Sequence, residues 1–150
     1  MSLANISQYQ TMRPPMMAKG GLAGAQDQVK QRKAMAIIGH YFQNIGLPVQ
    51  QSLAGVQKEI DNGLKLIQYE SSVMGYKDLG NGTAQIHFFT NGTIKDLADD
   101  IQYFVKQLKS MGINTIYDSR PAPVTTQALQ QQGAKIVPSD NPKYKFKAMI

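Results

Sequence analysis

Apolar and polar residues alternate over residues 83–90, and both faces of the strand that this pattern predicts carry an aromatic side chain, which is typical of a central strand. From 93 to 111 the apolar positions recur every three or four residues, which predicts an amphipathic helix with Thr93 as its N-cap and Gly112 at its end. Residues 113–118 predict a second strand. A strand, a helix and a strand in this order place the two strands in parallel in one sheet.

The segment before this unit predicts two helices and two further strands. Apolar spacing favours a helical region over 29–62, interrupted where Gly46 and Pro48 break the pattern. Strands are expected at 64–69 and 72–79, and the Asn81-Gly82 dipeptide predicts a tight hairpin into the strand at 83–90. These three strands are therefore expected to form an antiparallel meander.

The C-terminal segment predicts a short helix at 124–132 and strands at 134–137 and 143–150. In the last strand Lys143, Lys145 and Lys147 alternate with apolar residues. We interpret these lysines as protection of an edge strand against aggregation, and a strip that binds nucleic acid is the alternative. The whole pattern predicts an α/β (α+β) class, with a helix pair, antiparallel strands, and then a β-α-β parallel unit in a mixed sheet.

Residues 1–28 carry Pro-Pro and Gly-Gly breakers and no apolar periodicity, which predicts an extended, flexible arm before a globular domain at 29–150. Scattered apolar and basic side chains on such an arm favour docking onto a partner surface, and a disordered terminus without a role is the alternative. The residues expected to contact the partner are Met12, Arg13, Met16, Met17, Lys19 and Leu22.

Composition narrows the classes of function. The chain has 150 residues, enough for one domain with a hydrophobic core, and it has no cysteine, which excludes disulfides and thiolate chemistry. Its net charge of +6 is concentrated at the two ends, which predicts contact with DNA or acidic protein surfaces, or solvated tails. No apolar run reaches the roughly 20 residues of a membrane span, and the first residues do not form a secretory signal. The acidic cluster Asp96, Asp99 and Asp100 is explained by the helix dipole, so no metal site is predicted.

The order of elements and the block "GINTIYDS…ALQQQGAKIV…NPKYKFK" resemble the acyl-CoA N-acyltransferase fold, called GNAT-like below. The resemblance implies a glycine-rich turn that holds the coenzyme diphosphate at the start of the helix after residue 90. Here that turn is Asn91, Gly92 and Thr93, with one glycine, so no cofactor and no catalytic residue are predicted. Tyr117 and Tyr144 could supply the general acid of such enzymes, or could be ordinary residues of amphipathic strands.

The stretch "MMAKGGLAGAQDQVKQ", residues 16–31, resembles the start of small virion proteins of tailed bacteriophages. Together the two resemblances imply a non-catalytic structural or accessory virion protein, made in the host cytoplasm and present in several copies per particle. Its arm would attach it to portal, capsid, neck or tail proteins. One alternative is an active acetyl-CoA-dependent N-acetyltransferase with a divergent cofactor site. Another is a module that binds nucleic acid through its basic ends.

Overall fold

A computed structural model describes residues 14–119 and 123–150, and describes their side-chain surroundings from residue 29 onward except at Ile94. The chain divides into two compact units, Met1–Lys33 and Ala34–Ile150. The elements in chain order are α2 (Pro14–Asn44), α3 (Val49–Asp61), β1 (Lys65–Tyr69), β2 (Ser72–Gly80), β3 (Thr83–Thr90), α4 (Ile94–Ser110), β4 (Thr115–Asp118), α5 (Pro123–Gln131), β5 (Lys135–Val137) and β6 (Phe146–Met149).

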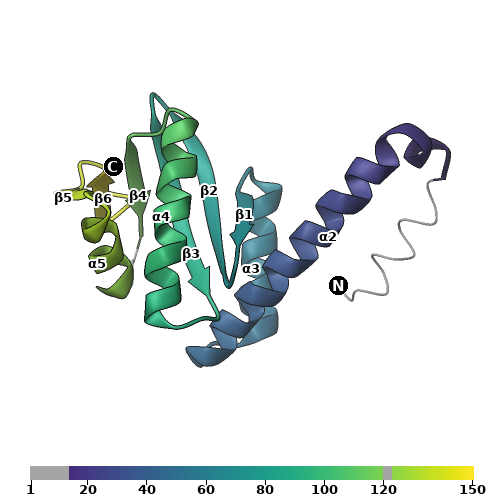
Figure 1. Ribbon diagram of the computed structural model, residues 1–150, viewed down its shortest axis with the longest axis horizontal. Coiled ribbons are helices and arrows are strands. Elements are labelled where there is room, and N and C mark those ends of the chain that lie inside the picture. The colour runs from purple at the N-terminus through teal and green to yellow at the C-terminus, as the bar shows by residue number, and fades with distance from the viewer. Residues whose placement is uncertain (1–13, 120–122) are drawn as a thin grey trace. The chain divides into compact units, whose positions relative to one another are not determined.

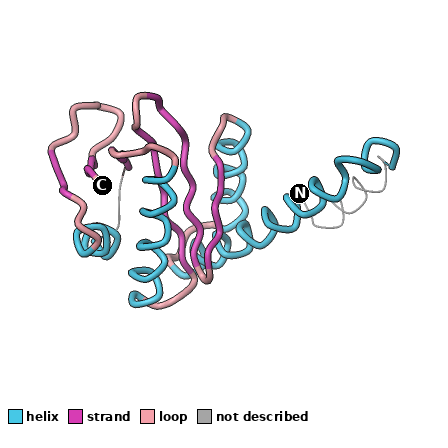
Figure 2. The backbone as a smooth tube through the Cα atoms, turned by 45° about the horizontal axis from the view of Figure 1, so that its top comes forward, coloured by secondary structure: helices cyan, strands magenta, loops and turns pink. Residues whose placement is uncertain are grey.

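The six strands form one mixed sheet in the order β1-β2-β3-β4-β6-β5 (Figures 1 and 2). Strands β3 and β4 are parallel, and the other neighbouring pairs are antiparallel. This arrangement confirms the predicted α/β class, the antiparallel meander over β1–β3 and the β3-α4-β4 parallel unit.

Helices cover both faces of the sheet in the second unit. On one face, α4 and α5 pack on the alternate residues Ala84 and Ile86 of β3, and the cluster is centred on the fully buried Phe104. On the other face, the C-terminal part of α2 and helix α3 pack on Phe89 and Val73. Figure 1 shows α4 in front of the sheet and α3 behind it. The two aromatic-bearing faces of β3 are therefore both covered, as the alternation predicts.

Local signals explain why these elements begin and end where they do. Asn81 and Gly82 have φ angles of 56° and 75°, which is the backbone of a two-residue hairpin turn between β2 and β3. Thr93 is the N-cap of α4 and exchanges hydrogen bonds with Asp96 in a capping box. Gly46 and Pro48 lie in the break between α2 and α3. The structure therefore confirms the predicted hairpin turn, the predicted N-cap at Thr93 and the predicted break in the helical region.

Two expectations from the sequence need correction. Residues 14–28 belong to helix α2, where the sequence predicts an arm without regular structure. Strand β6 lies between β4 and β5, so the prediction of a lysine-protected edge strand at 143–150 is wrong. The strand is also shorter than predicted, because a turn precedes it. In this turn the amide of Lys143 donates to the Asn141 side chain and the amide of Tyr144 donates to the Asn141 carbonyl, so β6 begins only at Phe146.

The predicted partner contacts fall outside the described side chains. Met12 and Arg13 lie outside the described residues, and the side chains of Met16, Met17, Lys19 and Leu22 lie outside the described part of α2. Among the described residues, no helix combines the length and the apolar character that crossing a membrane requires.

Candidate active site at the end of the β3–β4 ladder

The parallel pairing of β3 with β4 ends early and leaves a gap in the sheet. The ladder comprises Thr83 with Thr115, Ala84 with Ile116, and Gln85 with Tyr117. Strand β3 continues to Thr90, whereas β4 ends at Asp118, so residues 86–90 extend beyond the β4 pairing. The carboxyl ends of neighbouring parallel strands are a usual position for ligand sites in α/β sheets.

A cavity of about 270 Å³ lies at this point. Its walls come from both faces of the sheet: α2 and the loop after it contribute from one face, and α4 and α5 from the other. Most of the lining is apolar, and the polar groups are few. The lining residues are Tyr41, Phe42, Ile45, Leu47, His87, Phe88, Phe89, Thr90, Leu97, Asp118, Val124 and Thr125.

His87 and Asp118 form an ion-pair or hydrogen-bond contact across the gap. The distance from His87 Nδ1 to Asp118 Oδ1 is 3.2 Å, and the Asp118 side chain is 5% exposed while that of His87 is 31% exposed. Because an ionised carboxylate only accepts hydrogen bonds, Nδ1 carries the proton in this contact. The neutral ring then has its lone pair on Nε2, the arrangement of a general base oriented by a carboxylate.

An aromatic wall stands beside this pair. The Tyr41 ring lies 5.4 Å from that of Phe89 and 5.6 Å from that of Phe42, and both contacts are edge-to-face. Burial raises the pKa of the Tyr41 hydroxyl, and the negative charge of Asp118 raises the pKa further. The hydroxyl therefore stays protonated well into the alkaline range, and the carboxylate of Asp118 lies close enough to act on it.

The two tyrosines that the sequence offers as general acids do not line the cavity. The Tyr117 hydroxyl donates to Asp140 Oδ1 at 2.8 Å, and the Tyr144 hydroxyl donates to Gln85 Oε1 at 2.8 Å. Tyr144 still connects to the site, because Gln85 Nε2 lies 3.3 Å from His87 Nε2. Neither hydroxyl is placed to protonate a group bound between β3 and β4.

The turn Asn91–Thr93 does not fit a coenzyme diphosphate. The amides of Asn91, Gly92 and Thr93 already donate to Ser71 O, Thr90 Oγ1 and Asp96 Oδ2, each at 3.0 Å. A Cβ at Gly92 would lie 2.5 Å from Ser71 Oγ, so the space beside this glycine is filled by the protein itself. Hydrogen bonds from Thr93 hold the pKa of Asp96 below its usual range, so Asp96 adds a negative charge at this turn.

A second, acidic hollow lies beside the start of α4 and includes Glu70, Asp96 and Asp100. Asp100 is 3% exposed and accepts a hydrogen bond from the buried Ser72 hydroxyl. Burial raises the pKa of Asp100, and the charges of Asp96 and Glu70 add to this, against the hydrogen bonds from Ser72 and Ser71. Within the described ranges, no group of three or more His, Cys, Asp or Glu side chains could hold a metal ion.

Asp100→Asn is expected to become more stable relative to the natural protein as the pH rises. Because the folded-state pKa of Asp100 is raised, its contribution to stability is complete below the unfolded pKa near 3.8 and is lost as the pH increases through the folded pKa. The difference in Tm between Asp100→Asn and the natural protein should therefore grow from pH 4 to pH 8. A 1 kcal/mol effect corresponds to roughly 2–4 °C in a chain of this size. The exposed Asp99→Asn, with the same change in charge, is the control, and an equal trend in both variants would contradict the assignment.

Sequence reasoning missed His87 and Asp118 as a site. The signal was present, because His87 lies near the carboxyl end of one predicted parallel strand and Asp118 ends the other. The resemblance instead placed the expected site at the turn Asn91–Thr93, at the start of α4. The structure brings His87 and Asp118 together in the gap between β3 and β4.

No protein-family model and no curated protein matches the sequence. Among solved structures, an aminoglycoside 6′-acetyltransferase type Ii is similar, with a TM-score of 0.50, 15% identity, and coverage of 81% of this chain and 87% of that chain. A ribosomal-protein-alanine N-acetyltransferase from Brucella melitensis gives a TM-score of 0.37 at 6% identity, covering 69% of this chain and 76% of that one. A protein described as a phosphinothricin N-acetyltransferase gives a TM-score of 0.42 at 9% identity, covering 65% of this chain and 73% of that chain.

These three structures are described as acetyltransferases. The first of these similarities shows that the chain has a GNAT-like fold, as the element order predicts. The expected role as a non-catalytic structural virion protein is therefore corrected, because the similar structure with a TM-score of 0.50 is that of an acetyltransferase and not of a phage particle component.

Proposed function

We propose that this protein is an N-acyltransferase that moves an acyl group from a thioester to a primary amine in the cavity between β3 and β4. The observation that carries the proposal is the His87–Asp118 contact of 3.2 Å inside a gap in the sheet of a GNAT-like fold. In this reaction the amine nitrogen bonds to the acyl carbon, the carbon–sulfur bond breaks, and the thiol leaves with a proton.

The residues of the cavity suit an amine acceptor. A primary amine is an ammonium ion at neutral pH, and the buried carboxylate of Asp118 attracts that charge. The ammonium must lose a proton before its nitrogen can attack, and Nε2 of His87, which the Gln85 amide faces at 3.3 Å, becomes the base when that amide turns aside. Asp118 holds the other ring nitrogen and stabilises the imidazolium that forms, as a carboxylate does in other oriented histidine bases.

The walls of the cavity favour an amine on an apolar body. Ile45 and Leu47, in the loop between α2 and α3, are 51% and 46% exposed although they line the cavity. Exposed apolar side chains at a cavity gain free energy when an apolar ligand covers them. Amines with a short aliphatic or aromatic body are therefore the expected acceptors.

The acyl donor is expected to be recognised through its thioester end. The turn at Asn91–Thr93 has its amides engaged by the protein and carries the charge of Asp96, so we assign it no role in holding a diphosphate. No step in the proposed reaction passes through that turn.

The test is to incubate the protein with 2-phenylethylamine or hexylamine and a thioester, and to detect the N-acyl product by mass spectrometry. The donors are acetyl-CoA and S-acetyl-N-acetylcysteamine, a thioester without a diphosphate. We expect product from both donors at comparable rates. If neither donor gives product with any amine, the proposed function is wrong. A preference for acetyl-CoA above about 100-fold, equivalent to roughly 2.7 kcal/mol, would show instead that the diphosphate is bound.

A further inference from the structure

Four side chains form a continuous series of polar contacts that ends in the cavity. Tyr144 Oη lies 2.8 Å from Gln85 Oε1, and Gln85 Nε2 lies 3.3 Å from His87 Nε2. His87 Nδ1 lies 3.2 Å from Asp118 Oδ1. The series therefore joins the loop before β6 to the end of β4, through two residues on the same face of β3.

The carboxylate of Asp118 sets the direction of the hydrogen bonds in this series when the His87 ring is neutral. Asp118 accepts, so His87 Nδ1 donates and the neutral ring accepts at Nε2. Gln85 must then present its amide N–H to His87, which turns its carbonyl oxygen toward Tyr144, and the Tyr144 hydroxyl donates to that oxygen. All donors point toward Asp118, and hydrogen bonds in such a series polarise one another.

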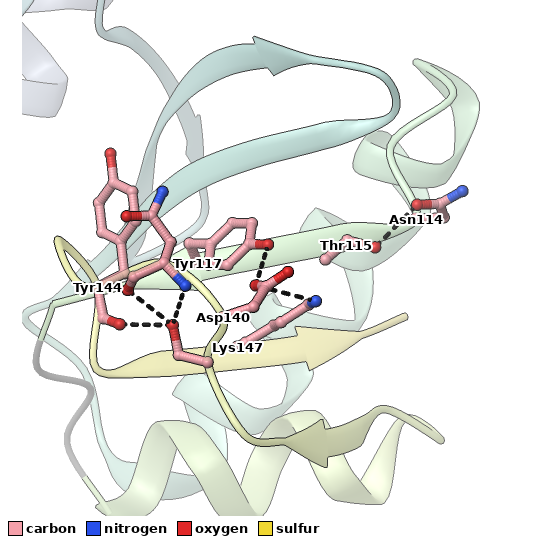
Figure 3. Close-up of polar contacts among 8 residues, drawn as sticks. Asn114, Thr115, Tyr117, Asp140, Tyr144 and Lys147 are labelled. Carbon is pink, nitrogen blue, oxygen red and sulfur yellow. Dashed lines mark hydrogen bonds and ion pairs between the residues drawn. The ribbon is translucent and has the colours of Figure 1, made fainter.

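Tyr144 is itself held in place, so it can serve as a fixed partner for the Gln85 side chain. It is 4% exposed, its carbonyl accepts from Ser139 Oγ at 2.6 Å, and its ring lies 5.5 Å from that of Tyr117. The Tyr117 hydroxyl in turn donates to Asp140, which also binds Lys147 Nζ at 3.1 Å (Figure 3).

These contacts also fix the charges around the loop. The hydrogen bonds from Tyr117 and Lys147 lower the pKa of Asp140, and its carboxylate raises the pKa of Lys147. Both groups therefore remain charged around neutral pH, and the loop keeps its anchor on β6.

We infer that Gln85 and Tyr144 are positioning residues that favour the Nδ1–H tautomer of His87, with the Gln85 amide donating to the unprotonated Nε2. The arrangement is fixed by the Tyr144–Gln85 and Gln85–His87 contacts together with the carboxylate at the other end. The catalytic meaning of the tautomer rests on the proposed function, whereas the tautomer itself is a property of the free protein.

Proton uptake at Nε2 has a structural consequence. An imidazolium N–H cannot face the amide N–H of Gln85, so the amide has to turn and present its oxygen to the ring. The Gln85 NH₂ group then faces Tyr144, and a hydroxyl can accept as well as donate. Tyr144 therefore satisfies both orientations of Gln85, which a phenylalanine at this position could not do.

The experiment is ¹⁵N NMR of the histidine rings in the full chain without substrates. The chain has two histidines, and the exposed His40 serves as the internal reference for a ring in solvent. A His40→Gln variant assigns the signals. At pH 7.5 we expect His87 to show a protonated Nδ1 and an unprotonated Nε2, with signals distinct from those of His40.

Two variants test the roles of the positioning residues. In Gln85→Glu the new carboxylate only accepts, so we expect Nε2 of His87 to become protonated at the same pH. In Tyr144→Phe we expect Gln85 to lose its second partner and the Nε2 signal of His87 to move, because its hydrogen bond from Gln85 weakens. The natural protein alone can overturn the inference, if His87 carries its proton on Nε2. Folded variants with an unchanged His87 spectrum would also overturn it. Neither result depends on turnover, so a failure here is distinct from a failure of the proposed function.

Discussion

His87→Gln is expected to slow acyl transfer by about 100- to 10,000-fold, the usual range for removing a general acid–base group. Glutamine preserves a polar side chain of similar length but cannot take the proton from the amine. The rate loss should appear in kcat as well as in kcat/KM, because the proton is transferred during the reaction and not during binding. The measurement is the initial rate of N-acyl product formation with a fixed thioester and varied amine.

The matched control is His40→Gln, which makes the same chemical change at an exposed position of α2. It should leave the rate within a factor of two or so of the natural protein, since exposed substitutions usually change stability by less than about 0.5 kcal/mol. If the two variants retain equal activity, His87 is not the base and the cavity between β3 and β4 is not the reacting site.

Phe104→Ala is expected to lower the free energy of unfolding by about 3–5 kcal/mol. The Phe104 side chain is fully buried in the cluster between α4 and the sheet. Its ring lies 5.8 Å from Tyr103, 5.9 Å from Phe88 and 6.5 Å from Tyr69, so its removal leaves a cavity that no single neighbour fills. Urea unfolding followed by circular dichroism measures the change.

The exposed Gln102→Ala on the same helix controls for the effect of alanine on α4 itself, and it should change the free energy of unfolding by less than about 0.5 kcal/mol. A loss below about 1 kcal/mol in Phe104→Ala would mean that this cluster is not the main core of the second unit.

The parts of the fold that the sequence predicts well depend on local signals. Thr93 and Asp96 lie three residues apart and form the capping box, and Asn81-Gly82 specifies its hairpin turn wherever the strands later pack. The position of the last strand depends instead on pairing with β4, about thirty residues earlier in the chain. Alternating lysines do not indicate which strands will pair with the strand that carries them, so the interpretation of residues 143–150 as an edge strand was wrong.

The site was harder to predict than the fold for a related reason. His87 and Asp118 are 31 residues apart, and each fits an ordinary strand position when taken alone. Their contact arises because the β3–β4 ladder stops at Gln85, and no residue type marks that point in the sequence. The single glycine at position 92 lies where the resemblance implies a diphosphate turn, but in the structure its amide donates to Thr90 Oγ1 and the space beside it is filled by Ser71.

The early end of the ladder has one more consequence. Since the cavity draws its walls from both faces of the sheet, side chains of α2 on one face and of α5 on the other border the same space. A ligand bound there would contact two layers of the protein that the sheet elsewhere keeps apart.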